Sequence, residues 1–335
     1  MIFYRMKSHD IGRNLATEQY LMNHLNLTEP LLLFYYQTPC IIVGHNQNTL
    51  EEVNQEYVAE HQIMVTRRLS GGGAVFDDLG NLSFSFVINN PDEFGDFKTF
   101  TQPIVDALHE MGATGVEVSG RNDLLVDGKK FSGNAMYTKN GKIFSHGTLM
   151  LDVDLDVVSH ALNVPEDKIK SKGIKSVRSR VTNLKPYLDA EYQNIDVPEF
   201  RDTLLKKLYG VDDVAKIADK EYQLTKEDEA AIEDLVEKYY HNWDWVYGSS
   251  PEFTIKRRQH FDAGTIDARI LVKSGKIQKI TFFGDFFGTQ DVEALEQQLV
   301  GVRYEETALT KALQLINTSN YFAGISKQQL IELLV

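Results

Sequence analysis

Residues 120–150, which read GRNDLLVDGKKFSGNAMYTKNGKIFSHGTLM, decide the fold class of this chain. Two Asx-Gly pairs, Asp127-Gly128 and Asn140-Gly141, each lie between two runs of strand-like residues. An Asx-Gly pair in that position is the strongest short-range signal for a β-hairpin. Strands joined by such tight turns must be antiparallel. We therefore expect an α/β protein of the α+β kind, with helices packed on a mixed or antiparallel sheet, rather than a doubly wound parallel sheet.

The residues before these hairpins predict one helix and three further strands. Residues 11–25 place apolar side chains at helical spacing, and we expect Glu18 at the edge of that stripe rather than as a buried functional carboxylate. Residues 31–44, LLLFYYQTPCIIVG, predict two short buried strands separated at Pro39. Residues 81–90, NLSFSFVINN, alternate as a half-buried strand does.

A boundary between two domains is predicted at residues 248–251, GSSP, because Gly, Ser and Pro cluster there. The preceding residues 199–240 are highly charged and have helical periodicity. We therefore expect a larger domain over residues 1–247 and a small α+β domain over residues 252–335. The small domain is predicted to contain a hairpin around Ser274-Gly275 and helices over residues 291–300, 305–316 and 326–334.

The composition of the 335-residue chain is that of an ordinary globular protein, with 42% apolar and 25% charged residues. Its 35 Lys and Arg residues against 48 Asp and Glu residues give a net charge of −13. Because non-specific binding to nucleic acid or membranes needs positive charge, neither partner is expected. Cys40 is the single cysteine and lies in an apolar run, which predicts an inert buried thiol and excludes an internal disulfide. Without a long apolar run or a signal peptide, a cytoplasmic protein is expected.

Residues 67–76, RRLSGGGAVF, contain three consecutive glycines between a strand and a further apolar run. Glycines in series lose much conformational entropy on folding, so they indicate close approach to a ligand or a positive φ. The N–H groups of such a loop can bind an anion, and Arg67 and Arg68 can add fork-shaped donors for phosphate or carboxylate. The alternative is a tight connection between strands with two solvated arginines. The spacing is not that of a P-loop or of a dinucleotide-binding motif.

Two further segments carry cations that suit an anionic ligand. Lys129 and Lys130 follow the first Asx-Gly turn on a strand, so their side chains are expected on opposite faces. Lys130 lies near the small Gly133 and can reach a phosphoryl or carboxyl group, while Asp123 can orient this lysine or hold Mg²⁺ through a phosphate. Residues 168–180, KIKSKGIKSVRSR, contain six cations, a local reversal of the chain's charge. Solvated surface cations are the alternative for both segments.

Four motifs follow one another along the chain: RRLSGGGAVF at residues 67–76, GRNDLL and GKKFSGNA within residues 120–135, HGTLML at residues 146–151 and KGIKSVRSRVTNL at residues 172–184. In this order they resemble the motifs of lipoate–protein ligases. The resemblance covers residues 1–247 as the catalytic domain, and the remainder is similar to the accessory C-terminal domain of the longer members. It implies an α/β catalytic domain related to biotin–protein ligases.

The resemblance implies a reaction in two steps. Lipoate and Mg·ATP give lipoyl-AMP and pyrophosphate, and the lipoyl group then passes to a lysine of a lipoyl-carrier domain. That carrier is a glycine-cleavage H protein or an acyltransferase subunit of a 2-oxoacid dehydrogenase. ATP and Mg²⁺ are the implied cofactors and lipoate is the implied substrate. No metal ion held by a cluster of protein ligands is implied.

The resemblance also implies roles for individual residues. Lys130 corresponds to the family's active-site lysine, which contacts the lipoyl carbonyl and the adenylate phosphate, and Asp123 corresponds to the aspartate of the GRND motif. Both are implied catalytic residues, and residues 173–181 correspond to the loop that covers the adenylate. The implied contacts to ATP and lipoyl-AMP are Arg68, Ser70, Gly71, Gly72, Gly73, Ala74, Val75, Phe76, Asn81, Asn122, Lys130, Gly133, Ala135, His146, Lys175, Arg178 and Arg180. The implied contacts to lipoate are Arg68, Gly72, Gly73 and Lys130.

Two positions depart from the family pattern. Asp77 stands where the motif V-F-H-D has histidine, and His45 stands where V-G-R-N-Q-N has arginine. Both changes alter charge near the nucleotide or the carrier surface, and they bear on substrate preference more than on reaction class.

Two other functions stay open. One is an octanoyl- or lipoyl-transferase, which works through a cysteine thioester without ATP and would have only Cys40 for that step. The other is a non-catalytic module that binds lipoate or lipoyl-AMP.

Overall fold

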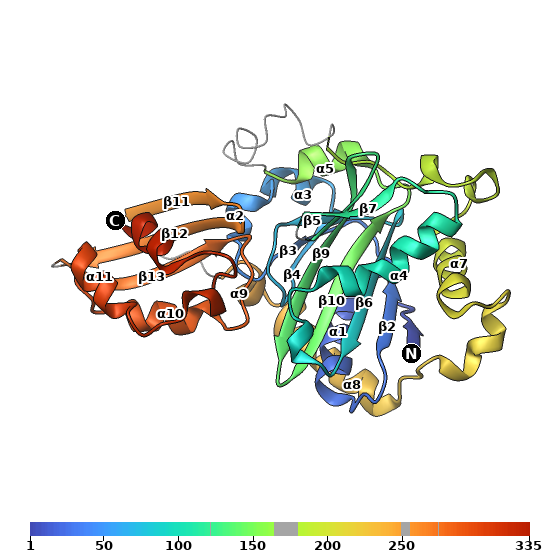
Figure 1. The fold of residues 1–335 in the computed structure, drawn as a ribbon, viewed down its shortest axis with the longest axis horizontal. Coiled ribbons are helices and arrows are strands. Elements are labelled where there is room, and N and C mark those ends of the chain that lie inside the picture. Colours follow the sequence, from blue (N-terminus) through green and yellow to red (C-terminus); the bar gives the residue numbers. More distant parts are fainter. Residues whose placement is uncertain (121, 164–179, 249–254, 274) are drawn as a thin grey trace.

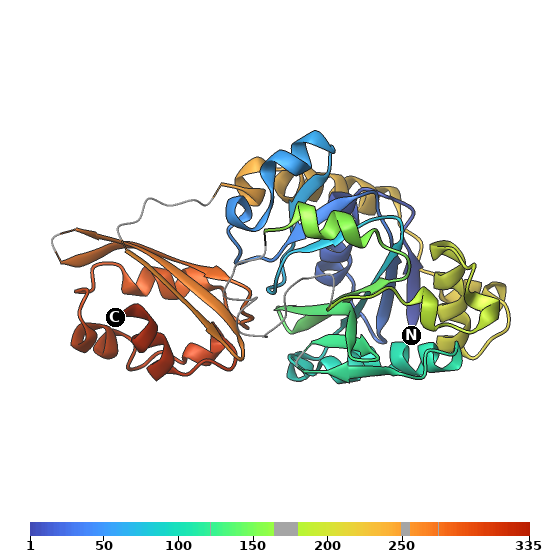
Figure 2. The same cartoon turned by 90° about the horizontal axis from the view of Figure 1, so that it is seen from above.

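The computed structural model describes all residues of the chain except 121, 164–179, 249–254 and 274. Two lobes lie side by side, a larger one that contains the N-terminus and a smaller one that contains the C-terminus (Figures 1 and 2). The predicted boundary at residues 248–251 falls mostly outside the described residues.

The larger lobe is built on a seven-stranded sheet with the strand order β1-β2-β6-β10-β9-β8-β7. Only β1 and β2 are parallel among its pairs, so the sheet is mixed and mainly antiparallel, as predicted. Its strands are β1 (Ile2–Arg5), β2 (Leu31–Tyr35), β6 (Asn81–Ile88), β7 (Val116–Ser119), β8 (Asp123–Val126), β9 (Lys129–Lys139) and β10 (Lys142–Met150).

Both Asx-Gly pairs form the predicted hairpin turns. Asp127 and Gly128 have φ of 50° and 76°, and Asn140 and Gly141 have φ of 53° and 76°. Positive φ at both central residues is the geometry of a type I′ turn, whose twist matches that of the strands it joins. The turns therefore fix the register in which β8, β9 and β10 pair.

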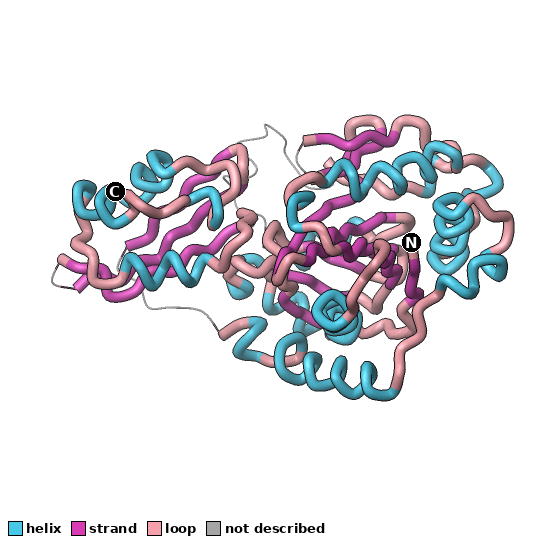
Figure 3. Tube along the Cα trace, turned by 60° about the horizontal axis from the view of Figure 1, so that its bottom comes forward, coloured by secondary structure: helices cyan, strands magenta, loops and turns pink. Residues whose placement is uncertain are grey.

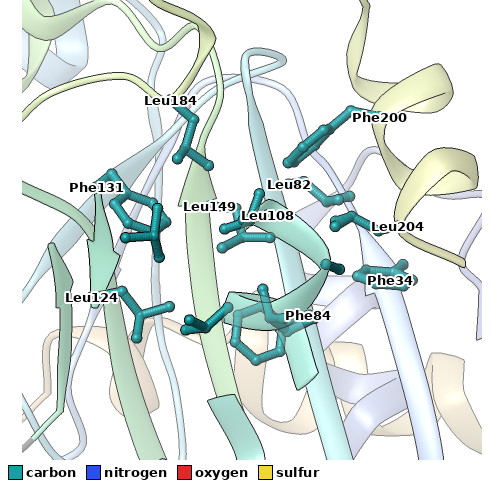
Figure 4. Packing of buried hydrophobic residues seen from close by; sticks show 14 of the residues in the cluster. Phe34, Leu82, Phe84, Leu108, Leu124, Phe131, Leu149, Leu184, Phe200 and Leu204 are labelled. Carbon is teal, nitrogen blue, oxygen red and sulfur yellow. The ribbon is translucent and has the colours of Figure 1, made fainter. Parts of the chain in front are cut away.

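Helices cover both faces of this sheet (Figure 1). On one face, α4 (Phe97–Glu110) and α7 (Val197–Tyr209) form a core with alternate strand residues such as Phe34, Leu82 and Phe84 (Figure 4). On the other face, α1 (Ile11–His24) and α8 (Lys226–Leu235) pack on the intervening residues of β2. The expectation of a half-buried strand at residues 81–90 is wrong, because burial on both faces leaves Asn81 to Val87 inaccessible.

A second sheet of three strands, in the order β4-β3-β5, lies beside the first and carries the glycine-rich segment. Its strands are β3 (Cys40–Val43), β4 (Met64–Arg67) and β5 (Val75–Asp77), and α2 (Thr49–Glu52), α3 (Gln55–Glu60) and α5 (Leu155–Ala161) accompany it. We call residues 68–74, which join β4 to β5, the glycine-rich loop. Cys40 is buried at the start of β3, which confirms the prediction of a buried thiol.

The smaller lobe consists of an antiparallel sheet with its helices along one side (Figure 3). The strands are β11 (Ile255–Phe261), β12 (Gly264–Lys273) and β13 (Lys276–Gly284), and the helices are α10 (Val292–Leu299), α11 (Glu306–Ala312) and α12 (Lys327–Leu334). These helices agree with the periodicity of the sequence, and they form a hydrophobic core of their own with the sheet.

Short helical turns complete the fold. They are η1 (Pro91–Glu93), η3 (Lys185–Tyr187), η4 (Ala190–Tyr192), η5 (Val214–Lys220), the π-helical turn η6 (Val236–Tyr240), α9 (Trp243–Val246) and η7 (Thr318–Asn320). In the part of the chain that the structure describes, no helix combines the length and apolarity needed to span a bilayer.

Candidate functional site

A pocket lies where the glycine-rich loop meets β9 and β10 of the large sheet. The structure brings together at this pocket most of the predicted site residues that it describes. They are Arg68, Gly72, Gly73, Ala74, Val75, Asn122, Lys130, Gly133, Ala135 and His146. Lys175 and Arg178 lie outside the described residues.

The other predicted residues lie near the pocket without lining it. Phe76 is buried in the core of the small sheet, and Asn81 donates to Ser83 Oγ at 3.2 Å. Ser70 is a buried residue of the loop that contacts His146, and Gly71 faces the smaller lobe. Asp123 and Arg180 both contact Lys130, which does line the pocket.

The three glycines of the loop have three different surroundings. A Cβ on Gly71 would lie 2.4 Å from the carbonyl oxygen of Phe286, so another side chain is excluded there by the smaller lobe. Gly72 has a φ of 91°, which favours glycine. Gly73 has no atom within 4 Å of its Cβ position, although it lines the pocket. Of the three, the open space beside Gly73 is where a ligand can approach the backbone.

The two arginines at the start of the loop, Arg67 and Arg68, are buried and form hydrogen bonds within the protein. Arg67 donates to the carbonyl oxygens of Gly44, His45 and Gln47, among other acceptors. Arg68 donates to Ser70 Oγ at 3.0 Å and to the carbonyl oxygens of Ile42, Gly71 and Gly73. The interpretation of both arginines as solvated is therefore wrong, and protein oxygens occupy most of their donors, while Arg68 still lines the pocket.

Burial lowers the pKa of each of these guanidinium groups to about 10, and both therefore stay cationic at neutral pH. Most of their hydrogen-bond partners are neutral oxygens, so Arg67 and Arg68 contribute positive charge beside the loop. That charge favours an anion in the pocket.

A buried chain of side chains joins α1 to the glycine-rich loop. Both carboxylate oxygens of Glu18 lie 3.0 Å from Nδ1 of His146, and Nε2 of His146 lies 2.7 Å from Ser70 Oγ. Because Ser70 Oγ accepts from Arg68, its hydroxyl hydrogen is free to be donated to His146. The expectation that Glu18 lies at the edge of its helix is wrong, since only 2% of the residue is exposed.

Lys130 lines the pocket from β9. Its Nζ lies 2.8 Å from Asp123 Oδ1 on the neighbouring strand. The pairing of β8 with β9 skips Phe131, so a β-bulge follows Lys130 directly. Lys130 Nζ would lie 3.0 Å from a Cβ on Gly133, and the absence of that Cβ leaves room for the lysine side chain.

The segment that contains Asn122 is clamped to β9 by two asparagines. Asn122 Nδ2 donates to the carbonyl oxygen of Asn134 at 2.7 Å, and Asn134 Nδ2 donates to that of Asn122 at 3.1 Å. Among the described residues, Asn134 Oδ1 is a buried acceptor without a hydrogen-bond partner, and the residue lines the pocket. An unused acceptor at this place suits a ligand that carries a hydrogen-bond donor.

Comparison with known protein families shows what this pocket belongs to. The model described as lipoyl protein ligase A/B catalytic domain matches residues 10–209, and the model described as bacterial lipoate protein ligase C-terminus matches residues 250–334. The chain belongs to the lipoate–protein ligase family.

Individual relatives agree with this assignment. The ligase is 47% identical to the lipoate-protein ligase LplJ of Bacillus subtilis (strain 168) over 322 residues, which cover 96% of each chain. It is 45% identical to lipoate–protein ligase 1 of Staphylococcus aureus over 322 residues, 96% of this chain and 95% of the other.

Solved structures share its fold. The P. falciparum protein LipL1, solved in complex with lipoate, superposes with a TM-score of 0.77 at 22% identity, over 99% of this chain and 97% of that one. A lipoate-protein ligase A solved with bound ATP superposes with a TM-score of 0.61 at 25% identity, over 74% of this chain and 98% of that one.

The two departures from the family pattern lie outside the pocket of this ligase. Asp77 is 1% exposed and accepts from Gln37 Nε2 at 2.7 Å and from Ser83 Oγ at 3.3 Å. Burial raises the pKa of this carboxyl group to about 7. The ring of His45 lies 5.5 Å from that of Trp245, and burial lowers its pKa.

Several pocket residues of the ligase have no sequence motif that marks them. Leu15, Tyr35 and Ile42 come from three separate elements and supply apolar walls. Leu15 does belong to the apolar stripe of the first predicted helix, but so do residues that only fill the core. Their place at one pocket follows from the packing of α1, β2 and β3, which no local pattern specifies.

Proposed function

We propose that this ligase converts lipoate and ATP to lipoyl-AMP and pyrophosphate, and then transfers the lipoyl group to a lysine of a carrier protein. The observation that carries the proposal is that Lys130, with its ammonium group beside Gly133, lines the same pocket as the open backbone at Gly73. Relatives 45% to 47% identical over nearly the whole chain are lipoate–protein ligases, which supports the same reaction.

The pocket suits an acid with an alkyl chain because its walls differ in polarity. Leu15, Tyr35 and Ile42 are apolar walls, which favour burial of the chain. Lys130 and Asn122 supply polar groups, and we assign the carboxylate to that region. Lipoate bound in this direction places its carboxylate beside the Lys130 ammonium, where the charges attract.

The same region fits the phosphate of ATP. Gly73 leaves its backbone open, and the cations of Arg68 and Lys130 offset negative charge there. During adenylation the phosphorus gains negative charge, which a fixed ammonium group stabilises more in the transition state than in the ground state. We therefore assign electrostatic stabilisation to Lys130, and to Asp123 the task of holding that lysine in place.

We also propose Mg²⁺ as the companion of ATP. A Mg²⁺ ion that accompanies ATP keeps several waters and binds mainly through the phosphates and one or two carboxylates. The carboxylate of Asp123 lies 2.8 Å from Lys130 Nζ and is the group that would face such an ion. When bound, the ion would add positive charge at the phosphates.

Transfer to the carrier needs a neutral lysine amine. An unperturbed lysine has a pKa of about 10.4, so removal of its proton at pH 7 costs roughly 4.6 kcal/mol. The nearby positive charge of Lys130 and desolvation in the pocket both lower that pKa. We propose as carrier a glycine-cleavage H protein or an acyltransferase subunit of a 2-oxoacid dehydrogenase. A 27% identical neighbour from Thermoplasma acidophilum, a bi-partite ligase with a TM-score of 0.62, has an E2 lipoyl domain as its partner, which supports the second kind.

We further propose that residues 1–247 form the catalytic domain and residues 252–335 the accessory domain. The separate hydrophobic cores of the two lobes support this division.

Acyl transfer through a cysteine thioester is disfavoured by the surroundings of Cys40. The thiol is 1% exposed, and burial raises its pKa well above the usual value, so the reactive thiolate is scarce.

The experiment is modification of an apo lipoyl-carrier domain, followed by mass spectrometry, with lipoate and Mg·ATP. We expect addition of one lipoyl group that requires ATP. Modification from an acyl-carrier donor without ATP would support a transferase instead, and tight lipoate binding without any modification or pyrophosphate release would support a binding module.

A further inference from the structure

The smaller lobe reaches the outer side of the glycine-rich loop with the turn that follows β13, residues 284–288, GDFFG. The N–H of Gly284 donates to the carbonyl oxygen of Asn46 in the larger lobe at 2.6 Å. Phe287 is 5% exposed and belongs to the hydrophobic core of the larger lobe, with its ring 6.1 Å from that of Phe97. One lobe therefore contributes a core side chain to the other.

This turn touches the glycine-rich loop at two successive residues. The Cβ position of Gly71 lies 2.4 Å from the carbonyl oxygen of Phe286, and that of Gly72 lies 3.1 Å from Cζ of Phe287. Gly72 also lines the pocket. The loop backbone at Gly72 therefore contacts both the pocket and the Phe287 ring.

Phe287 is itself held firmly by its own lobe. Its carbonyl oxygen accepts from the N–H of Ala323 at 2.8 Å. A second contact joins the two lobes, since Arg269 Nη2 lies 2.6 Å from Glu51 Oε2. Arg269 is fixed in turn by Asp267, 2.6 Å from its Nε. These contacts therefore hold Phe287 in place where its ring packs against the loop.

We propose that Phe287 is a positioning residue for lipoate ligation. By packing on Gly72 and Phe97, it holds the glycine-rich loop in the shape that closes the pocket. The expected effect on the lipoate KM rests on the proposed function. The same turn explains why position 71 is a glycine. The carbonyl oxygen of Phe286, rather than a ligand, leaves no room for a side chain there.

The test compares full-length Phe287→Ala, the conservative Phe287→Leu and the control Phe283→Ala. Phe283 comes from the same lobe and is 6% exposed, but its ring lies by Arg269, 5.8 Å away, instead of by the loop. The measurements are KM and kcat for lipoate-dependent pyrophosphate release, the melting temperature, and amide hydrogen exchange of residues 70–76.

If the loop holds its closed shape for only a fraction of the time, the apparent affinity for lipoate falls in proportion to that fraction. We expect Phe287→Ala to raise the lipoate KM about tenfold with kcat changed less than about twofold, and to speed exchange in residues 70–76. Phe287→Leu restores most of the lost affinity because it refills the contact. Phe283→Ala changes neither the lipoate KM nor the exchange of the loop.

Two results would overturn the inference. One is an unchanged KM and unchanged loop exchange in a folded Phe287→Ala protein. The other is an equal effect of Phe283→Ala, which would indicate general loosening of the lobes. If the wild type releases no pyrophosphate, the proposed function fails, while hydrogen exchange still tests whether Phe287 holds the loop.

Discussion

Glu18 and His146, 128 residues apart in the sequence, form a buried pair in which both carboxylate oxygens lie 3.0 Å from the imidazole Nδ1. Through Ser70, the pair extends to the glycine-rich loop. Helix α1 thereby fixes one end of the loop from inside the protein. His146, in the middle of this connection, also lines the pocket.

Replacement of Glu18 by Ala should destabilise the protein. The change leaves the buried His146 without its acceptor, and an unsatisfied buried polar group costs about 1–3 kcal/mol. We expect a loss of that size in urea unfolding. The matched control is Glu227→Ala on α8, where the side chain is exposed. Equal losses in the two variants would contradict a stabilising role for the pair.

Asp77 should make stability depend on pH. Its folded pKa of about 7 lies above the ordinary value of 3.8, so the folded state binds the proton more tightly than the unfolded state does. The free energy of unfolding therefore falls as pH rises from about 4 to about 7, and then stays at the lower level.

Asp77→Asn removes this titration while it keeps an acceptor for Gln37 and Ser83. We expect the variant to be more stable than the wild type at pH 8, by on the order of 2 kcal/mol, and to lose that advantage near pH 4. Burial also raises the pKa of Glu296 to about 7. The contribution of Asp77 is therefore the difference in unfolding free energy between the variant and the wild type at each pH. Parallel curves of stability against pH would refute the assignment.

Cys40 should be dispensable for lipoylation. Its thiol is buried in β3 and does not line the pocket, so Cys40→Ala is expected to keep kcat within about twofold while it lowers the melting temperature. The measurement is lipoylation of a carrier domain by the variant and by the wild type. Loss of activity in a folded variant would support acyl transfer through a Cys40 thioester instead.

Local patterns were sufficient for much of the fold. The Asp127-Gly128 turn was predictable because its geometry depends on two adjacent residues, and the same holds for the hairpin at Asn140-Gly141. Burial of Cys40 followed from its apolar neighbours. The motif order also led to Lys130 and the loop, which the structure places at one pocket.

Other features depended on partners far away in the chain. Glu18 looked like an edge residue because its partner His146 lies on a different element. Phe286 of the smaller lobe excludes a side chain at Gly71, and no sequence pattern near either residue predicts this contact. Arg67 and Arg68 looked like ligand donors because the carbonyl oxygens that occupy them become neighbours only in the folded chain.

Lys130 is central to this account, and the most direct test compares Lys130→Ala with Lys129→Ala. Both lysines lie on β9 next to each other, but only Lys130 lines the pocket. The measurement is pyrophosphate release from Mg·ATP and lipoate without a carrier. We predict a loss of about a hundredfold or more in kcat for Lys130→Ala and a change of less than about twofold for Lys129→Ala. Normal lipoate-dependent release by a folded Lys130→Ala protein would contradict the account.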